Sequence, residues 1–264
     1  MVTANVIHGF NTANWSLDAS FMEQLTDPGE PYDAVCPFYL IEHPEGVAVV
    51  DTGLSHEMLD APAEYGQHGA AFMEAFLPAI EYGPELRPES HLESVGYAPE
   101  DVDYVIMTHL HSDHAGHVDT FPDAEFLVHR DELRYAHWPV PVQDVFYLEG
   151  DFDCRRADEY EVTPLLGEYD VFGDGSVRTV PTPGHTPGHQ SVFVELDSGP
   201  VVLGADVAHR QSGYDREHLA SFNWNLSESV DSLRKIKALA RETDANVYVT
   251  HESDHIDAFA GGMR

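Results

Sequence analysis

The sequence has little positive charge and almost no lysine. Its 264 residues include 47 Asp and Glu but only 13 Lys and Arg, so the formal net charge is −34 with histidine neutral. Lys235 and Lys237 are the only lysines. An excess of negative charge repels nucleic-acid phosphates and anionic lipid headgroups. We therefore exclude a general nucleic-acid-binding protein and a membrane-surface protein.

Cysteines and long apolar runs are also scarce. Cys36 and Cys154 are the only cysteines and do not form a C-x-x-C pair, which excludes a disulfide scaffold and a zinc ribbon. No run approaches the length of about 18 apolar residues that a membrane helix needs. The segment Met1–Phe21 has neither a basic region nor the apolar region of a signal peptide. We expect a soluble, cytoplasmic protein.

The acidic residues are spread along a chain that is 42% hydrophobic, which is enough to bury a substantial core. This composition is typical of a halophilic protein. At molar salt the Debye length falls to about 3 Å, so a surface that repels itself in dilute buffer becomes tolerable.

Alternating strand and helix patterns run through both halves of the sequence. Val35–Glu42 and Val47–Asp51 flank a turn and predict a β-hairpin. The spacing in Gly69–Ile80 predicts a helix that either packs on the core or covers a substrate pocket, and Pro139–Tyr160 is expected to be a surface loop or insertion. The other predicted strands are Asp103–Thr108, Ala124–His129, Ser176–Val180, Gln190–Leu196, Pro200–Gly204 and Asn246–Thr250. The other predicted helices are Pro88–Val95, Arg130–Trp138 and Ser227–Arg241.

Strands precede helices in each half, and no linker composition separates the halves. This order predicts an α/β (α+β) fold in which two β-rich halves pack sheet to sheet, with helices outside, as a four-layer αββα domain.

A cluster of metal-ligand side chains follows one buried strand. Directly after Tyr104–Thr108 comes His109-Leu110-His111-Ser112-Asp113-His114, which places four candidate ligands within six residues. Imidazoles and a carboxylate are the ligands that an ion such as zinc prefers. A polar surface loop would not explain why these residue types coincide with a strand end, so we interpret the cluster as a metal site.

Three further polar residues end apolar strands elsewhere. His185 lies in the turn Thr182–His189, whose glycines and prolines present an imidazole without obstruction. Asp206 follows Val201–Ala205, and His251 follows Val247–Thr250. Each alone would be interpreted as a turn or capping residue, but together they indicate the remaining ligands.

This ligand order resembles that of the metallo-β-lactamase superfamily, and the resemblance covers nearly the whole chain. It implies the four-layer αββα sandwich as a single domain over residues 1–264. Asp51, in Val49–Gly53, matches an early Asp-Thr-Gly turn of the superfamily and is expected to orient the metal ligands without binding the metal itself.

Within the superfamily the sequence is most similar to the N-acyl homoserine lactone lactonases, which are quorum-quenching enzymes. The matching stretches are Cys36–Leu40, Val95–Asp101, Thr108–Gly116 and Thr182–Ser191.

The resemblance also implies a ligand set for two divalent ions. One ion would be held by His109, His111 and His185, the other by Asp113, His114 and His251, and Asp206 would bridge them. We expect His189 to support His185 through a hydrogen bond, and His117 to be a surface histidine. Zinc is the expected metal, and iron, manganese or cobalt suit the same ligands.

The implied activity is hydrolysis of the lactone ring by a hydroxide that bridges the two metals. Asp113 or Asp206 would then shuttle the proton. These lactonases usually place a tyrosine three residues after the bridging aspartate to polarise the substrate carbonyl, but this chain has His209. We interpret His209, or else Tyr214 if its loop folds back, as the replacement.

The substrate is less constrained than the chemistry. The expected partner is a small-molecule lactone bound to a monomer or homodimer. A glyoxalase II-like thioesterase is the alternative, and it would need Arg130, Arg134, Arg155 and Arg156 to gather around an anionic glutathione substrate. A persulfide-oxidising mononuclear iron oxygenase is a further alternative, but it usually lacks part of the second ligand set. A non-catalytic binding module would not need the full set.

If the acidic surface is a halophilic adaptation, both folding and hydrolysis should fail in low salt, even with metal supplied. Circular dichroism and lactone hydrolysis, followed as salt is lowered from molar concentration to dilute buffer, measure both. Retention of native structure and full activity in dilute buffer would contradict this interpretation.

Overall fold

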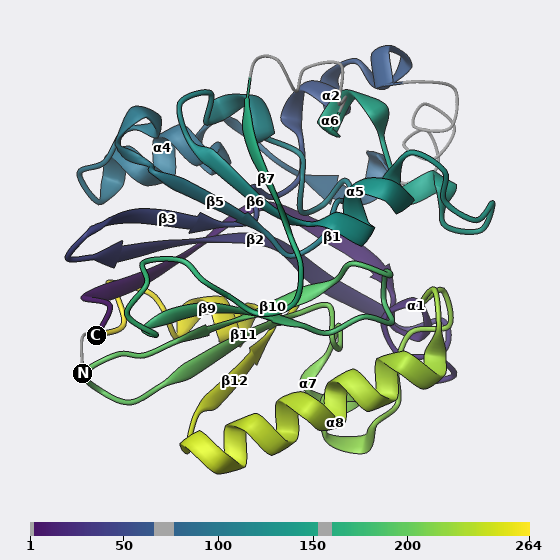
Figure 1. Cartoon of the computed structure of the whole chain (residues 1–264). Helices are drawn as coiled ribbons and strands as arrows, with labels where there is room; N and C mark the ends of the chain where they lie inside the picture. Colours follow the sequence, from purple (N-terminus) through teal and green to yellow (C-terminus); the bar gives the residue numbers. More distant parts are fainter. Residues whose placement is uncertain (1–2, 66–76, 153–159) are drawn as a thin grey trace.

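Two β-sheets lie face to face in the computed structural model, which describes residues 3–65, 77–152 and 160–264, and helices cover their outer faces (Figure 1). In that part of the chain the first sheet has the strand order β4-β1-β2-β3-β5-β6-β7, and the second has the order β12-β11-β10-β9-β8. The first sheet consists of β1 (Val6–Asp18), β2 (Pro31–His43), β3 (Gly46–Val50), β4 (Ile80–Glu81), β5 (Tyr104–Met107), β6 (Glu125–His129) and β7 (Glu161–Leu165). The second consists of β8 (Tyr169–Asp170), β9 (Val177–Pro181), β10 (Gln190–Val194), β11 (Val201–Ala205) and β12 (Asn246–Val249).

The helices form the two outer layers. Figure 1 shows α2, α4, α5 and α6 over the first sheet, and α7 and α8 over the second. The α-helices are α1 (Ala19–Met22), α2 (His56–Asp60), α4 (Pro88–Ser94), α5 (Arg130–Ala136), α6 (Glu149–Phe152), α7 (Gln211–Arg216), α8 (Leu226–Thr243) and α9 (Ser253–Asp257). The 3₁₀ turns are η1 (Pro62–Tyr65), η2 (Leu77–Ala79), η3 (Pro84–Leu86), η4 (Pro99–Asp101), η5 (Val118–Thr120) and η6 (Asp144–Phe146). No helix among the described residues is long and apolar enough to span a membrane.

The main hydrophobic core lies between the sheets. Ile41, Val50 and Ile106 of the first sheet pack in one cluster with Val192 and Leu203 of the second. Every residue of β10 and β11 is buried, because these strands have a sheet on one side and helices on the other. A strand buried on both faces has a nearly continuous apolar sequence, which explains the pattern that predicted it.

Two buried polar side chains join the halves near the ends of the strands. Gln190, which opens β10, donates from its side-chain amide to the carbonyl oxygen of Met107 on β5 (2.8 Å). Glu132, on α5, accepts hydrogen bonds from Leu110 N and from Thr186 Oγ1 at 3.0 and 2.6 Å. It also accepts from Tyr147 Oη and from the backbone N–H of Gly188. One carboxylate therefore holds together the loop after β5 and the turn after β9.

The predicted four-layer αββα fold is confirmed. The hairpin and the other predicted strands are present. Their ends are shifted by a residue or two, except that β2 begins four residues before the predicted start at Val35. The helices α4, α5 and α8 occupy the predicted helical segments. The long strand β1 was not predicted, because Asn11, Asn14 and a break in its pairing with β2 between them interrupt the alternation of apolar and polar residues.

Two predictions need comment. The predicted helix Gly69–Ile80 lies mostly outside the described residues. Its last four residues, 77–80, are described and belong to η2 and β4. Pro139–Tyr160 was predicted to be a surface loop or an insertion, and the surface-loop alternative was wrong for residues 139–152. There η6 and α6 form, and Gln143, Tyr147 and Leu148 are buried. Aromatic residues in this segment pack inward, which its lack of periodicity concealed.

The role of Glu132 predicts that Glu132→Gln destabilises the protein. An amide cannot accept hydrogen bonds at both of its terminal atoms, so at least two of the four buried donors would lose their acceptor. We expect a loss of about 2–4 kcal/mol in the free energy of unfolding. Chemical denaturation at constant molar salt measures it, with the exposed Glu242→Gln as matched control. Equal stability of the two variants would contradict this role.

Candidate metal centre

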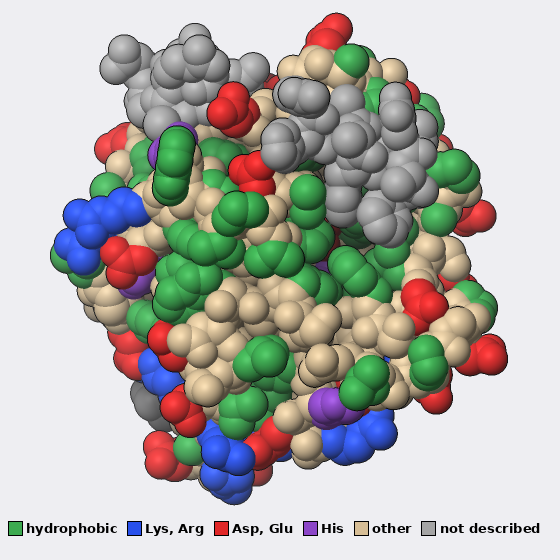
Figure 2. Space-filling view, turned by 90° about the vertical axis from the view of Figure 1, so that its right-hand side faces the viewer, with side chains coloured by type: hydrophobic (Ala, Val, Ile, Leu, Met, Phe, Trp, Pro, Cys, Tyr) green, Lys and Arg blue, Asp and Glu red, His purple; other side chains and the backbone are tan. Residues whose placement is uncertain are grey.

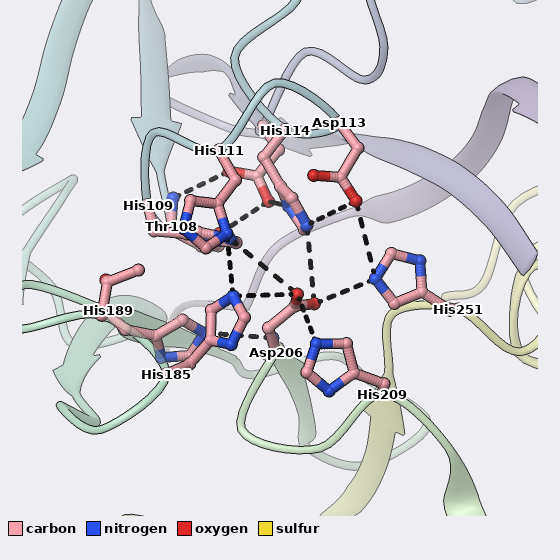
Figure 3. Close-up of polar contacts among 12 residues, drawn as sticks. Thr108, His109, His111, Asp113, His114, His185, His189, Asp206, His209 and His251 are labelled. Atoms are coloured by element: carbon pink, nitrogen blue, oxygen red, sulfur yellow. Dashed lines mark hydrogen bonds and ion pairs between the residues drawn. The ribbon is translucent and has the colours of Figure 1, made fainter. Parts of the chain in front are cut away.

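The predicted ligand residues converge at one edge of the two-sheet sandwich, where several strands end. His109, His111, Asp113 and His114 come after β5, and His185 lies in the turn after β9. Asp206 directly follows β11, and His251 comes two residues after β12. Figure 3 shows these side chains pointing toward one another around Asp206. Within the described residues they form groups whose ligand atoms lie within 4.8 Å of one another: His109 with His111 and His185, His109 with His114 and Asp206, Asp113 with His114 and His251, and His185 with Asp206 and His209.

Asp206 is placed by a strained turn of the backbone. The preceding residue, Ala205, has a φ angle of 49°, in the left-handed region that non-glycine residues rarely adopt. The pairing of β11 with β12 also shifts between Leu203 and Ala205. The backbone N–H of Asp206 then donates to His189 Nε2 at 3.0 Å, and His189 Nδ1 donates to the carbonyl oxygen of Thr182. The strain and the hydrogen bonds together aim the carboxylate inward.

The two oxygens of the Asp206 carboxylate face different groups of imidazoles. Oδ2 lies 3.3 Å from His185 Nε2, 3.3 Å from His209 Nε2 and 3.9 Å from His109 Nε2. Oδ1 lies 3.5 Å from His114 Nε2 and 3.4 Å from His251 Nε2. Asp206 therefore stands between two clusters of nitrogen atoms.

Asp113 and His111 complete the two clusters. Asp113 Oδ2 lies 3.8 Å from His114 Nε2 and 3.8 Å from His251 Nε2, on the Oδ1 side of Asp206. His111 Nδ1 lies 3.0 Å from His185 Nε2, on the Oδ2 side. The side chain of Asp113 is 19% exposed, against 3% for Asp206. Asp113 is therefore the carboxylate that opens toward solvent.

Three of the imidazoles are held by contacts at the nitrogen that faces away from the centre. His251 Nδ1 donates to the carbonyl oxygen of Val35 at 2.8 Å, and His185 Nδ1 lies 3.1 Å from Asn223 Oδ1. His109 Nδ1 lies 3.0 Å from Thr108 Oγ1. With the proton on Nδ1, each ring directs the lone pair of Nε2 toward Asp206. This is the usual way in which proteins orient metal-binding histidines.

Asp51 supports the centre from behind, as predicted. Its Oδ2 lies 2.8 Å from His114 Nδ1, and it accepts hydrogen bonds from the backbone N–H and the hydroxyl of Thr108, both at 2.7 Å. Asp51 has a φ angle of 57°, so the turn after β3 is strained in the same way as the turn after β11. This carboxylate orients His114 directly and His109 through the Thr108 hydroxyl.

Burial keeps part of the histidine cluster neutral. It lowers the pKa of His109, His111 and His185 well below the ordinary value for histidine. Because they are neutral at physiological pH, these rings have lone pairs available to bind a cation.

The pKa of Asp206 is lowered as well, but for a carboxyl group a lower pKa favours the charged form. Burial by itself raises the pKa of its carboxyl, but the imidazoles of His114, His209 and His251 outweigh burial and lower it well below its usual value. Asp206 is therefore ionised, the form in which a carboxylate binds metal.

The donor set fits divalent cations. His109 Nε2, His114 Nε2 and Asp206 Oδ1 are buried and have no hydrogen-bond partner among the described residues. A buried polar atom without a partner costs about 1–3 kcal/mol. Imidazole nitrogens and carboxylate oxygens at these separations are the ligands of zinc and similar ions. A pair of cations would satisfy the unpartnered atoms at once.

A largely apolar cavity adjoins the cluster. Its lining includes His111, Asp113, His185, Asp206, His209 and His251 at one end. The remaining lining residues are Trp15, Leu17, Phe21, Met22, Ala34, Cys36, Ser112, Phe146 and Phe222. Phe222 stacks on Phe21, with ring centroids 4.6 Å apart, and also contacts Phe146. The segment that was expected to be a surface loop thus contributes Phe146 to the cavity wall.

The two candidates for the missing tyrosine lie in different places. His209 is buried at the centre, with Nε2 facing Asp206. Tyr214 lies on α7 and packs in the apolar cluster with Leu233 and Ile236 of α8, under the Lys237 ammonium. It is not among the residues that line the cavity. Its pKa is raised to about 12 by burial. The structure does not bring Tyr214 to the site.

Two other histidine predictions were wrong. Among the described residues His189 makes no hydrogen bond with His185, although the two rings pack edge-on with centroids 6.0 Å apart; its Nε2 accepts from the backbone N–H of Asp206. His117 is 1% exposed and lies near His56 and Glu57, so it is not a surface histidine. Sequence reasoning also missed Asn223, the partner of His185 Nδ1, because it precedes α8 in a segment without a motif.

Comparisons with known proteins agree with this geometry. The family profile of the metallo-beta-lactamase superfamily matches residues 32–251. The chain is 33% identical over 228 residues to N-acyl homoserine lactonase AttM of Rhizobium radiobacter, covering 86% of this chain and 85% of that protein. It is 30% identical over 240 residues to N-acyl homoserine lactonase AiiA of Bacillus thuringiensis subsp. kurstaki, covering 89% and 88%.

Solved structures share the fold. An N-acyl homoserine lactone hydrolase with N-hexanoyl-L-homoserine bound at its catalytic metal center superposes with a TM-score of 0.81 at 24% identity, over 97% of this chain and 96% of that chain. AidC, a dizinc quorum-quenching lactonase, superposes with a TM-score of 0.66 at 14% identity, over 95% and 92%. The family match and the curated relatives together cover most of the sequence and all of the predicted ligands. The chain belongs to the metallo-beta-lactamase superfamily.

Proposed function

We propose that this protein is a metal-dependent hydrolase that opens the lactone ring of N-acyl homoserine lactones to give N-acyl homoserines. The observation that carries the proposal is the position of Asp206, whose two oxygens face separate imidazole clusters. That arrangement suits a carboxylate bridging two divalent ions. The relatives named as N-acyl homoserine lactonases support the substrate class.

The two clusters define the proposed ligand sets. His109, His111 and His185 would hold one ion with Asp206 Oδ2, and Asp113, His114 and His251 would hold the other with Asp206 Oδ1. Zinc is the proposed metal, since the ligands suit it and the structurally similar AidC is a dizinc enzyme. We also propose that residues 1–264 act as one hydrolase domain, because the ligands come from both sheets.

When bound, such ions lower the pKa of water and polarise an ester carbonyl. The residues of the chain supply positioning and proton transfer. Asp113 is the proposed proton carrier, because it contacts the histidines through Oδ2 alone and is partly exposed. Asp206 is fully enclosed among imidazoles, so its role is to hold the two halves of the centre in place.

The cavity wall favours a substrate with an apolar arm. Trp15, Phe21, Phe146 and Phe222 supply apolar side chains to the wall of the cavity that the candidate metal ligands also line. Figure 2 shows hydrophobic side chains gathering across the middle of the face that lies at the right of Figure 1, with acidic side chains mainly toward its edge. The acyl chain of an N-acyl homoserine lactone would pack on this surface while the lactone ring reaches the metal ligands.

Both alternatives fit less well. The cavity lining includes no Lys or Arg among the described residues, so it offers no cation for glutathione carboxylates. Arg130 and Arg134 each lie near Asp131, and Arg155 and Arg156 fall outside the described residues. A mononuclear iron oxygenase would not require the second cluster of Asp113, His114 and His251.

Removal of metal should abolish lactone hydrolysis. Dialysis against a chelator in molar salt, followed by an assay for ring-opened acid, should show loss of activity, and added zinc should restore it. Bound metal counted in parallel should approach two ions per chain. The same assay should be run with simple lactones, lactoylglutathione and a phosphotriester. Hydrolysis that survives metal removal would contradict the proposed mechanism, and preference for lactoylglutathione would contradict the proposed substrate.

Asp51→Asn should weaken the centre without unfolding the protein. Loss of the charge behind His114 reduces that ring's basicity and its fixed orientation, so we expect metal affinity or kcat/KM to fall by about 10- to 100-fold. Asp33→Asn, which changes an exposed carboxylate on β2, is the matched control. Equal metal affinity and activity in the two variants would refute the supporting role of Asp51.

A further inference from the structure

We propose that His209 is itself a metal ligand, on the same side of the centre as His109, His111 and His185. This inference rests on the proposed dinuclear site and changes the composition of one half of it. The family resemblance implied for His209 the role of a tyrosine that polarises the substrate carbonyl. The geometry points instead to coordination through Nε2.

The distances around Asp206 Oδ2 are those of atoms that share a cation. Two ligand atoms, each about 2.0–2.2 Å from one four- or five-coordinate ion and separated by angles of roughly 90–120°, lie roughly 2.8–3.8 Å apart. His209 Nε2 lies 3.3 Å from Asp206 Oδ2, the same distance as His185 Nε2. A charge-assisted hydrogen bond to a carboxylate would be shorter, at about 2.7–2.9 Å. His209 therefore has the spacing of a co-ligand, as His185 does.

The ring nitrogens of His209 make no hydrogen bond in the described part of the molecule. The side chain is only 3% exposed, and neither Nδ1 nor Nε2 has a hydrogen-bond partner among the described residues. His185 and His251 face the same carboxylate and each have a partner for Nδ1, whereas the orientation of His209 depends on packing alone. An unpartnered imidazole in this position is costly unless a bound cation accepts its lone pair.

Packing holds the ring in place. It lies nearly parallel to His251, with an interplanar angle of 9° and centroids 5.5 Å apart. The ring of Phe222 contacts the His209 ring edge-on, with centroids 5.2 Å apart. The ring of His185 also contacts it edge-on, with centroids 5.0 Å apart. Figure 3 shows His209 directed at the same carboxylate as His185 and His251. A ligand fixed by packing needs little reorganisation when the ion binds.

Coordination by His209 would make the two metal positions unlike. The Oδ2 side would offer the nitrogens of His109, His111, His185 and His209 with one carboxylate oxygen, and the Oδ1 side two nitrogens with the oxygens of Asp113 and Asp206. Nitrogen-rich sites favour zinc, copper, nickel or cobalt over manganese, and oxygen-rich sites accept harder ions. The two positions should therefore differ in affinity and in metal preference.

The test is metal binding by His209→Ala and His209→Gln, measured without substrate and in molar salt. Metal-free protein is titrated with Co²⁺, and the visible absorption of the bound cobalt is recorded along with the number of ions retained and their affinity against a competing chelator. We expect the nitrogen-rich position to lose affinity by about tenfold or more, and its cobalt spectrum to change. His209→Tyr should show the same loss, because a neutral phenol is a poor ligand.

The matched control is His117→Ala, since His117 is also buried and also has an unpartnered Nε2, yet faces Glu57 instead of Asp206. Circular dichroism confirms folding of each variant, and His209→Gln provides the polar substitute if the alanine variant fails to fold. Unchanged metal number, affinity and cobalt spectrum in folded His209 variants would overturn the inference, as would an equal loss in the control.

These outcomes separate the inference from the proposed function. If the wild-type protein binds cobalt through His209 but hydrolyses no lactone, the inference stands and the proposed substrate fails. If it hydrolyses lactones and the His209 variants bind metal normally, the proposed function stands and His209 is not a ligand.

Discussion

The structure of this centre depends on one carboxylate that faces histidines on both sides. Asp206 is enclosed by the rings of His109, His185 and His209 near one oxygen and His114 and His251 near the other. Like-charged rings could not gather this closely, so burial must keep part of the set neutral while Asp206 stays ionised. The strained turn at Ala205 and the hydrogen bond that the backbone N–H of Asp206 donates to His189 hold Asp206 in place.

The sandwich architecture brings these groups together because the loops that carry them leave one edge of both sheets. Glu132 connects the loop after β5 to the turn after β9. Gln190 connects the start of β10 in the second sheet to the end of β5 in the first. Val35 and Asn223, which belong to no motif, fix the outer nitrogens of His251 and His185. Orientation of these side chains is thus a property of the whole fold. An acidic surface is compatible with it because Asp51 and Asp206 are buried apart from that surface.

Much of the fold and the composition of the site could be predicted from the sequence, for identifiable reasons. The strands β10 and β11 are buried on both faces and so have largely apolar sequences. Asp206 and His251 could be identified because each is a polar residue that follows an apolar strand closely. The inward packing of Phe146, the burial of His117 and the contact of His189 with Asp206 depend on segments distant in sequence, so no local pattern contains them. Tyr214 was misplaced for the same reason: α7 turns it toward α8 and away from the cavity. The proximity of His209 Nε2 to Asp206 Oδ2 could be recognised only from the structure.

The most direct test of the central claim is anomalous diffraction at the zinc absorption edge from crystals of the zinc-loaded protein grown in molar salt. The account predicts two anomalous peaks, one on each side of the Asp206 carboxylate, with His185 Nε2 near one and His251 Nε2 near the other. A single peak, or two peaks that do not share Asp206, would contradict it.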